Sequence, residues 1–266
     1  MSNSKVELRK ILPVFLSFIV MGYVDIIGVA RGYVKKDFEL TDFAAQFLPM
    51  MVLLWFFVLA VPVGVLQDKF GKRNMLNIGM VIQAIGLGLP FILYSLTIMY
   101  ASFILLGIGN TIIQVSANPL LQDVSPSEKL ASYMSTSQFV KAIISFSGPL
   151  IATFFFTSFG DWKLAFAVYG ITSLLAALWL SMTPISESKP DRKPASLGVF
   201  LAPGNTTEFV SIFIIGLGIG NMFPIIFSLA LDRLPERANE VSGLIVLAVS
   251  GGAFIPLMMG FISTIF

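Results

Sequence analysis

The sequence has no cysteine and no histidine among its 266 residues. Without these side chains the chain can form no disulfide, no thiolate nucleophile and no imidazole-based metal site or serine-histidine catalytic arrangement. Charged residues make up only 12% of the chain, and the formal net charge of +2 is spread among several segments. The composition therefore argues against an enzyme, a bound metal or cofactor, and a nucleic-acid partner.

Apolar surface dominates the chain instead. Hydrophobic residues account for 56% of it, 25 of them Phe, and the mean hydropathy is +0.87. This is more apolar surface than a soluble domain of this length can bury, which predicts an all-α membrane protein in a lipid bilayer. Runs of about 20 apolar residues, the length that crosses a bilayer, predict about eight helices, near 11–33, 44–66, 74–95, 98–121, 130–156, 162–182, 208–231 and 241–265.

The order of these helices predicts two unequal bundles. Residues 1–182 hold six helices, a charged and Pro-containing linker covers 183–207, and 208–266 hold the last two helices. If the N-terminus is cytoplasmic, the outer loops near the first six helices hold only Arg31, Lys35, Lys36 and Lys163. The cytoplasmic segments hold ten bases, which is a positive-inside bias: Lys5, Arg9, Lys10, Lys69, Lys72, Arg73, Lys129, Lys189, Arg192 and Lys193. We expect a monomeric, multi-pass protein of a bacterial inner membrane whose first helix is a retained span.

One cytoplasmic loop carries a specific motif. Its defining residues are Gly64, Asp68, Lys69, Gly71, Lys72 and Arg73. This spacing resembles the loop between the second and third helices of the major facilitator superfamily. Gly64 is expected to allow close helix approach, Asp68 to lie at a neighbouring helix N-terminus, and the bases to keep the loop cytoplasmic. An ordinary basic loop would explain the charges but not the two glycines and the acid at fixed offsets.

Three amides form a stripe on the helix predicted near 98–121. Asn110, Gln114 and Asn118 follow at i+4 steps, so they share one face. Pro119 removes a backbone hydrogen bond beside them and predicts a bend. Amides donate and accept without charge, which suits the hydroxyl groups of a sugar or polyol. The alternative is that the amides bond across helices as packing contacts.

Two charges are predicted deep in the bilayer, Asp25 in the first helix and Lys141 in the fifth. A buried acid is a candidate proton or cation site, and an intramembrane Lys can act as its counter-ion or contact an anionic substrate. A static ion pair between the two is the alternative. Gln138 lies three residues before Lys141 and shares its helix face.

Other segments are similar to the L-fucose/proton symporter family, a branch of the same superfamily. Residues 114–119 (QVSANP) resemble its fourth helix, 221–229 (NMFPIIFSL) its tenth, and 242–260 its eleventh. The resemblance implies a neutral sugar substrate, proton coupling and a cavity between two halves of the molecule. It adds Asn221 and Ser228 to the candidate binding residues and gives Asp68 and Arg73 a gating role on the cytoplasmic side.

The chain departs from that family at several positions. Gln114 stands where the family carries a glutamate, Asp25 lies about one helical turn earlier than the family's acid, and Lys141 replaces a small or amide residue. A different coupling ion, an anionic sugar acid or uncoupled facilitation would therefore also fit. Helices seven to nine and twelve of the family have no counterpart, so we expect a longer transporter lacking its middle. A truncated, non-transporting receptor or remnant is the alternative to a transporter.

Overall fold

The computed structural model describes residues 3–126 and 129–188. The chain divides into two units, Met1–Pro194 and Ala195–Phe266, and every described residue belongs to the first. The helices predicted near 208–231 and 241–265, together with Asn221 and Ser228, lie outside the described residues.

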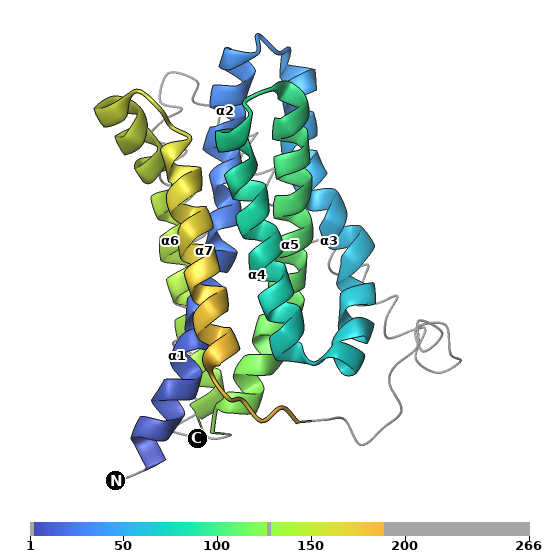
Figure 1. Ribbon diagram of the computed structural model, residues 1–266, viewed down its shortest axis with the longest axis vertical. Helices are drawn as coiled ribbons and strands as arrows, with labels where there is room; N and C mark the ends of the chain where they lie inside the picture. Colours follow the sequence, from blue (N-terminus) through green and yellow to red (C-terminus); the bar gives the residue numbers. More distant parts are fainter. Residues whose placement is uncertain (1–2, 127–128, 189–266) are drawn as a thin grey trace, which may run out of the picture. The chain divides into compact units, whose positions relative to one another are not determined.

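The described part is a bundle of helices (Figure 1). The elements are α1 (Asn3–Gly22), the 3₁₀ turn η1 (Tyr23–Ile26), α2 (Ile27–Asp37), α3 (Asp42–Phe70), α4 (Lys72–Ile92), α5 (Leu96–Val124), α6 (Leu130–Phe159) and α7 (Leu164–Met182). The first three elements form one continuous span, so the described residues contain six helices long and apolar enough to cross a membrane. This confirms the prediction of six spans before residue 183.

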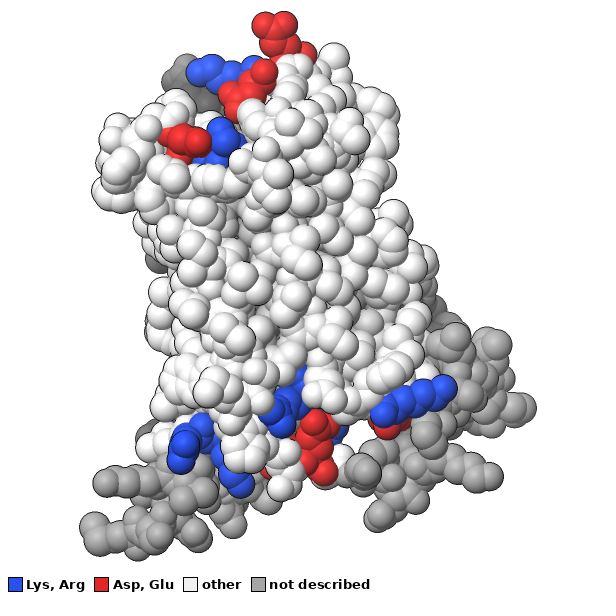
Figure 2. Space-filling model, viewed as in Figure 1, with Lys and Arg blue, Asp and Glu red and all other residues white. Residues whose placement is uncertain are grey.

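The length of the helices matches a bilayer. The shortest complete crossings are α7, with 19 residues, and α4, with 21. At 1.5 Å per residue these helices are about 30 Å long, close to the thickness of the hydrocarbon core. On the face drawn in Figure 2, the charged side chains of the described residues gather toward the two ends of the helices, with a band of uncharged residues between them. The first unit is therefore built to lie in a membrane.

Local sequence signals define where the helices begin and end. The Thr41 hydroxyl accepts the Ala44 N–H at 3.2 Å before α3, and the Ser95 hydroxyl accepts the Ile98 N–H at 3.4 Å before α5. Such N-cap contacts satisfy amide groups that have no partner inside the helix. Gly71, with φ of +85°, separates α3 from α4, and Gly160, with φ of +75°, ends α6. These positive φ values favour glycine because it has no Cβ.

Helices α4 and α5 pack closely at two glycines. A Cβ added at Gly109 would lie 2.7 Å from the backbone nitrogen of Gln83, and one added at Gly79 would lie 2.9 Å from the Gly109 carbonyl oxygen. Small residues at such crossings allow backbones to approach, which is the usual way that helices pack in membranes. This crossing places Gln83 of α4 and Asn110 of α5 next to the first span.

The first span differs from the prediction of one helix near 11–33. The α-helical pattern stops at Gly22, continues as a 3₁₀ turn over Tyr23–Ile26 and resumes at Ile27. No proline lies inside this turn, so the interruption of the α-helix depends on contacts with neighbouring residues.

Candidate functional site

The broken turn of the first span presents Asp25. Tyr23, Val24 and Ile26 are buried, whereas Asp25 is exposed. A 3₁₀ stretch within a longer helix often marks a functional position. The Asp25 carboxylate therefore lies on the surface of the helix bundle, at the interrupted turn of the first span.

Helix α6 lies against this turn. A Cβ added at Gly22 would lie 2.9 Å from Cβ of Ile144 and 3.0 Å from the carbonyl oxygen of Lys141, so the turn approaches α6 closely. The Ser145 hydroxyl makes a very short hydrogen bond to the Asp25 carboxylate and lies 3.0 Å from the Lys141 carbonyl oxygen. Ser145 is thus the partner of Asp25, and the sequence analysis missed it.

Lys141 is partly buried one helical turn before Ser145. Among the described residues, Lys141 and Asp25 do not form the direct ion pair that the sequence suggested; the four ion pairs found there involve other residues. The site therefore keeps an ammonium and a carboxylate near one another without joining them.

Two of the predicted amides bond to one another between α5 and α6. Gln138 Nε2 donates to Asn118 Oδ1 at 3.4 Å, and Asn118 Nδ2 donates to the backbone carbonyl oxygen of Gln114 at 3.4 Å. Gln114, Asn118 and Gln138 are all partly buried, so each keeps some accessible surface. These bonds are long, which leaves the amides weakly committed to one another.

Asn110 does not join this group. Its side chain has 0% exposure, and its Nδ2 donates to the Met21 carbonyl oxygen at 3.4 Å. The three amides of the stripe share one face of α5, but the first span covers this face at Asn110. The i+4 spacing predicted the shared face; it could not predict which part of that face a neighbouring helix covers.

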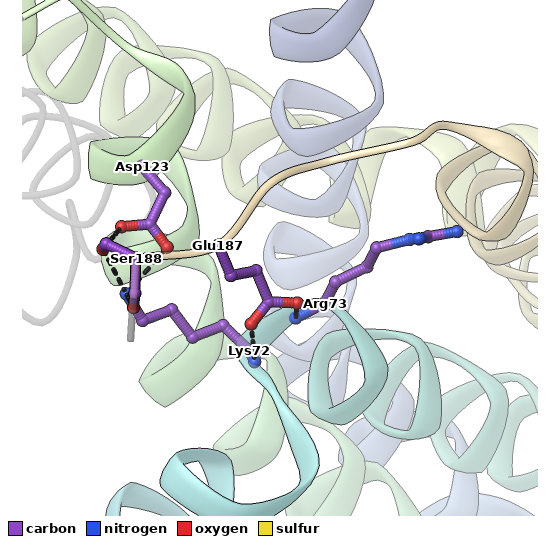
Figure 3. A network of polar contacts seen from close by, with 5 residues as sticks. All are labelled: Lys72, Arg73, Asp123, Glu187 and Ser188. Atoms are coloured by element: carbon purple, nitrogen blue, oxygen red, sulfur yellow. Dashed lines mark hydrogen bonds and ion pairs between the residues drawn. The ribbon is translucent and has the colours of Figure 1, made fainter. Parts of the chain in front are cut away.

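The motif between α3 and α4 lies at the opposite end of the spans from the α2–α3 turn. Figure 3 shows a network there, which we call the inner-end network: Lys72, Arg73, Asp123, Glu187 and Ser188. Glu187 accepts the backbone N–H groups of Lys72 at 2.6 Å and Arg73 at 3.1 Å, so a carboxylate lies at the N-terminus of α4. A helix N-terminus favours negative charge.

Two residues of the motif, Asp68 and Gly64, belong to α3. Asp68 lies partly buried in the last turn of α3, and its expected place at a neighbouring helix N-terminus stays a prediction; at the N-terminus of α4 the carboxylate is that of Glu187. A Cβ added at Gly64 meets nothing within 4 Å in the part of the chain that the structure describes, so Gly64 makes no close helix contact there. Gly71 is the glycine that geometry requires, because of its positive φ and its contact with Glu187.

The bases of the motif connect α4 to α5 and α7. Lys72 Nζ lies 2.7 Å from Asp123 Oδ2, and the Ser188 hydroxyl donates to the other oxygen of Asp123. The Arg73 side chain points away from this group in Figure 3; its Nε donates to the Leu180 carbonyl at 3.1 Å and its Nη2 to that of Ser181. Lys69 is exposed at the end of α3. Glu187, Asp123 and Ser188 were missed, because their partners are 51 to 116 residues away along the chain.

The other end of the bundle has its own polar contacts. Asp37 accepts from the Tyr94 hydroxyl at 2.6 Å and from Trp162 Nε1 at 3.3 Å, and Lys163 Nζ lies 4.4 Å from the centre of the Tyr94 ring. Burial, followed by the hydrogen bond to Asp37, raises the pKa of Tyr94. Arg31 contacts Asp42 at 3.8 Å. At this end of the bundle, these contacts join α2 to α3 and to the α4–α5 and α6–α7 turns.

Comparison with known proteins agrees with the fold. The family model of the Major Facilitator Superfamily matches residues 14–203, which is most of the chain. The bundle of apolar helices defines an integral membrane protein, and this match shows that the chain belongs to the major facilitator superfamily of transporters. The predicted fold class is confirmed.

Individual relatives match over shorter regions. A "Glucose/galactose transporter" of Brucella abortus biovar 1 (strain 9-941) is 48% identical over 50 residues, which are 19% of this chain and 12% of that protein. An "Uncharacterized transporter YycB" of Bacillus subtilis (strain 168) is 26% identical over 171 residues, 63% of this chain and 42% of that one. The chain thus matches less than half the length of either relative.

Solved structures show the same fold at low sequence identity. The proton:xylose symporter XylE, bound to 6-bromo-6-deoxy-D-glucose, aligns with a TM-score of 0.61 and 19% identity over 98% of this chain and 69% of that one. A bacterial homologue of the lysosomal transporter Spinster aligns with a TM-score of 0.58 and 17% identity over 94% of this chain and 59% of that one.

Proposed function

We propose that this chain is part of a secondary active transporter that moves a sugar or related small polar solute by alternating access, coupled to a proton or another cation. The observation that carries the proposal is the exposed Asp25 carboxylate on an interrupted span, beside Ser145 and Lys141 of α6. Discontinuous helices and ionisable groups near the middle of the membrane are the usual components of ion-coupled transport sites. The short match to a glucose/galactose transporter supports a sugar as the solute.

The proposed solute site consists of Gln114, Asn118 and Gln138. The bond from Gln138 to the Asn118 side chain and the bond from Asn118 to the Gln114 backbone carbonyl are both 3.4 Å long. Hydroxyl groups of a solute can therefore replace these bonds without the loss of a strong contact. Asn221 and Ser228, which lie outside the described residues, remain proposed solute-binding residues. Asn110 is left out of it, because its side chain is covered by the first span.

Asp25 is the proposed coupling residue. When ionised, its carboxylate accepts the Ser145 hydroxyl; when protonated, it becomes a donor and one acceptor position is lost. The hydrogen bonding between the first span and α6 therefore depends on the protonation state of Asp25. Lys141 is the second ionisable group of this region and contributes to its net charge in both protonation states of Asp25.

The inner-end network is proposed to hold the cytoplasmic ends of α4, α5 and α7 together while the bundle moves as a unit. Asp68 and Arg73 are proposed to contribute to gating on this side, as expected from the motif. With the N-terminus in the cytoplasm, this end faces the interior of a bacterial cell. We further propose that the transporter is a monomer in the inner membrane.

An anionic sugar acid is the second candidate solute. It is favoured by one observation: within the described residues, the partly buried Lys141 has no ion pair. An ammonium group without a direct counter-ion at this depth would bind a carboxylate strongly.

Uptake by membrane vesicles tests the proposal. Radiolabelled hexoses, amino sugars and sugar acids are screened with and without an imposed inward proton or sodium gradient, using the longest chain that carries this sequence. We expect gradient-dependent uptake of one class. Asn118→Ala should raise KM about fivefold, the value of one lost hydrogen bond, whereas Glu39→Gln, in an exposed outer turn, should leave uptake unchanged. Absence of uptake for every class would refute the proposal.

A further inference from the structure

The interruption of the first span leaves backbone carbonyl groups that need partners. The α-helical pattern stops at Gly22, so the carbonyl groups of its last turn, which include those of Val20 and Met21, lie where the regular i→i+4 bonding gives way to a 3₁₀ turn. Both residues are 1% exposed, so water does not reach them. Irregular backbone at membrane depth persists only where neighbouring groups satisfy it.

Two side chains supply these partners. Gln83 Nε2 of α4 donates to the Val20 carbonyl oxygen at 2.7 Å, and Asn110 Nδ2 of α5 donates to the Met21 carbonyl oxygen at 3.4 Å. A carbonyl can only accept, so the amide nitrogen must face it in each case. We call Gln83 and Asn110 the amide pair.

Packing alone does not explain the amide pair. Both side chains are 0% exposed, and their own oxygens, Gln83 Oε1 and Asn110 Oδ1, are buried without a partner among the described residues. An apolar side chain of the same size would avoid that cost. The hydrogen bonds that the two amides donate to these carbonyl groups offset part of that cost.

The opposite side of the turn faces α6. Gly22 approaches Ile144 and the Lys141 carbonyl, and Asp25 receives the Ser145 hydroxyl. The amide pair thus holds one side of a turn whose other side carries the carboxylate. A 3₁₀ turn advances about 120° per residue and an α-helix about 100°, so converting the turn to an α-helix would rotate Asp25, its third residue, by up to roughly 60°.

From this geometry we propose that Gln83 and Asn110 are positioning residues that keep Tyr23–Ile26 in the 3₁₀ conformation and thereby direct Asp25 toward α6. The importance of this role for transport rests on the proposed coupling function of Asp25; the position of the side chain does not. Loss of either donor favours an α-helical turn in which residue 25 is less accessible.

Thiol labelling measures that position directly, because the 266-residue chain contains no cysteine. Asp25→Cys, in native membranes, is labelled with a water-soluble maleimide. Adding Gln83→Met should lower the labelling rate about fivefold, the value of one lost hydrogen bond. Asn110→Leu should have a smaller effect, since its bond is 3.4 Å rather than 2.7 Å.

Two further variants separate positioning from packing. Gln83→Glu keeps the shape and, when protonated, a donor, and should restore the rate at acidic pH relative to Asp25→Cys alone. Ser102→Ala removes another fully buried donor, whose hydroxyl bonds the Gly86 carbonyl at 2.6 Å between the same two helices, and should leave the rate unchanged. If Gln83→Met does not fold, Gln83→Glu at acidic and neutral pH, with Asn110→Leu, decides the question.

The outcomes distinguish this proposal from the function on which it builds. Unchanged labelling in Gln83→Met and Asn110→Leu, or an equal decrease in Ser102→Ala, overturns the positioning role. With Asp25 intact, Gln83→Met should also shift the pH dependence of uptake, which Ser102→Ala should not do. If labelling falls but neutralising Asp25 leaves coupling unaffected, the amide pair stands and the coupling role fails.

Discussion

The ion pair between Lys72 and Asp123 should stabilise the bundle asymmetrically. The two charged groups lie 2.7 Å apart, and their side chains are 17% and 4% exposed respectively. At that distance their attraction is about 6 kcal/mol at an effective dielectric constant of 20, and most of it is offset by desolvation. The cost of breaking the pair therefore depends on which charge remains behind.

Lys72→Met leaves the nearly buried Asp123 carboxylate with the Ser188 hydroxyl as its one side-chain partner among the described residues. We expect a loss of about 3 kcal/mol in the free energy of unfolding. Asp123→Asn leaves Lys72, which is more exposed and within 3.5 Å of two Ser188 oxygens, so about 1 kcal/mol should be lost. The double variant Lys72→Met with Asp123→Asn removes both charges and should be more stable than Lys72→Met alone.

Thermal unfolding of the purified chain in detergent, followed by tryptophan fluorescence, measures this difference. At roughly 2–4 °C per kcal/mol, Lys72→Met should lower Tm by about 6–12 °C and Asp123→Asn by about 2–4 °C. The double-mutant cycle should give a coupling free energy above about 1 kcal/mol. Equal effects of the two single variants, with additivity in the double variant, would refute the reasoning.

Three further predictions concern the ends of the bundle and the coupling site. Gly71→Ala should lower the free energy of unfolding by about 1–3 kcal/mol, because φ is +85° and the new Cβ would lie 3.1 Å from the Glu187 carboxylate; an unchanged thermal midpoint would contradict this. The pKa of Tyr94 is raised by burial and by Asp37, so its contribution to stability should be complete below pH 10.0 and decline as the pH rises further. Urea unfolding of Tyr94→Phe should lack that decline, and an identical decline in both proteins would count against it. Ser145→Ala removes the donor to Asp25 and should change the pH dependence of uptake, whereas Thr136→Ala, whose hydroxyl bonds the Ser132 carbonyl of the same helix at 2.8 Å, should not.

The sequence predicted the bundle well because the bilayer imposes simple constraints. Apolar runs of about 20 residues must be helices, and charges must lie at their ends. The six described spans follow from these two facts, and the motif between Gly64 and Arg73 indicated the superfamily. The i+4 spacing of Gln114 and Asn118 also predicted a shared face correctly.

What the sequence could not predict depends on contacts between distant residues. The interruption at Tyr23–Ile26 contains no proline; it is associated with donors from Gln83 and Asn110, which lie 63 and 89 residues away. Glu187 occupies the N-terminus of α4 from 115 residues away, and no local pattern pointed to it. Such contacts are set by how the helices pack, and no periodicity within one helix reports them.

The role of Asp25 is tested most directly by comparing accumulation with exchange in the same vesicles. Asp25→Asn keeps the size of the side chain and removes its ionisation. The account predicts that gradient-driven accumulation of the solute is lost while exchange of labelled for unlabelled solute continues. Accumulation that remains at the level of the unmodified protein in Asp25→Asn vesicles would contradict the assignment of this carboxylate as the coupling site.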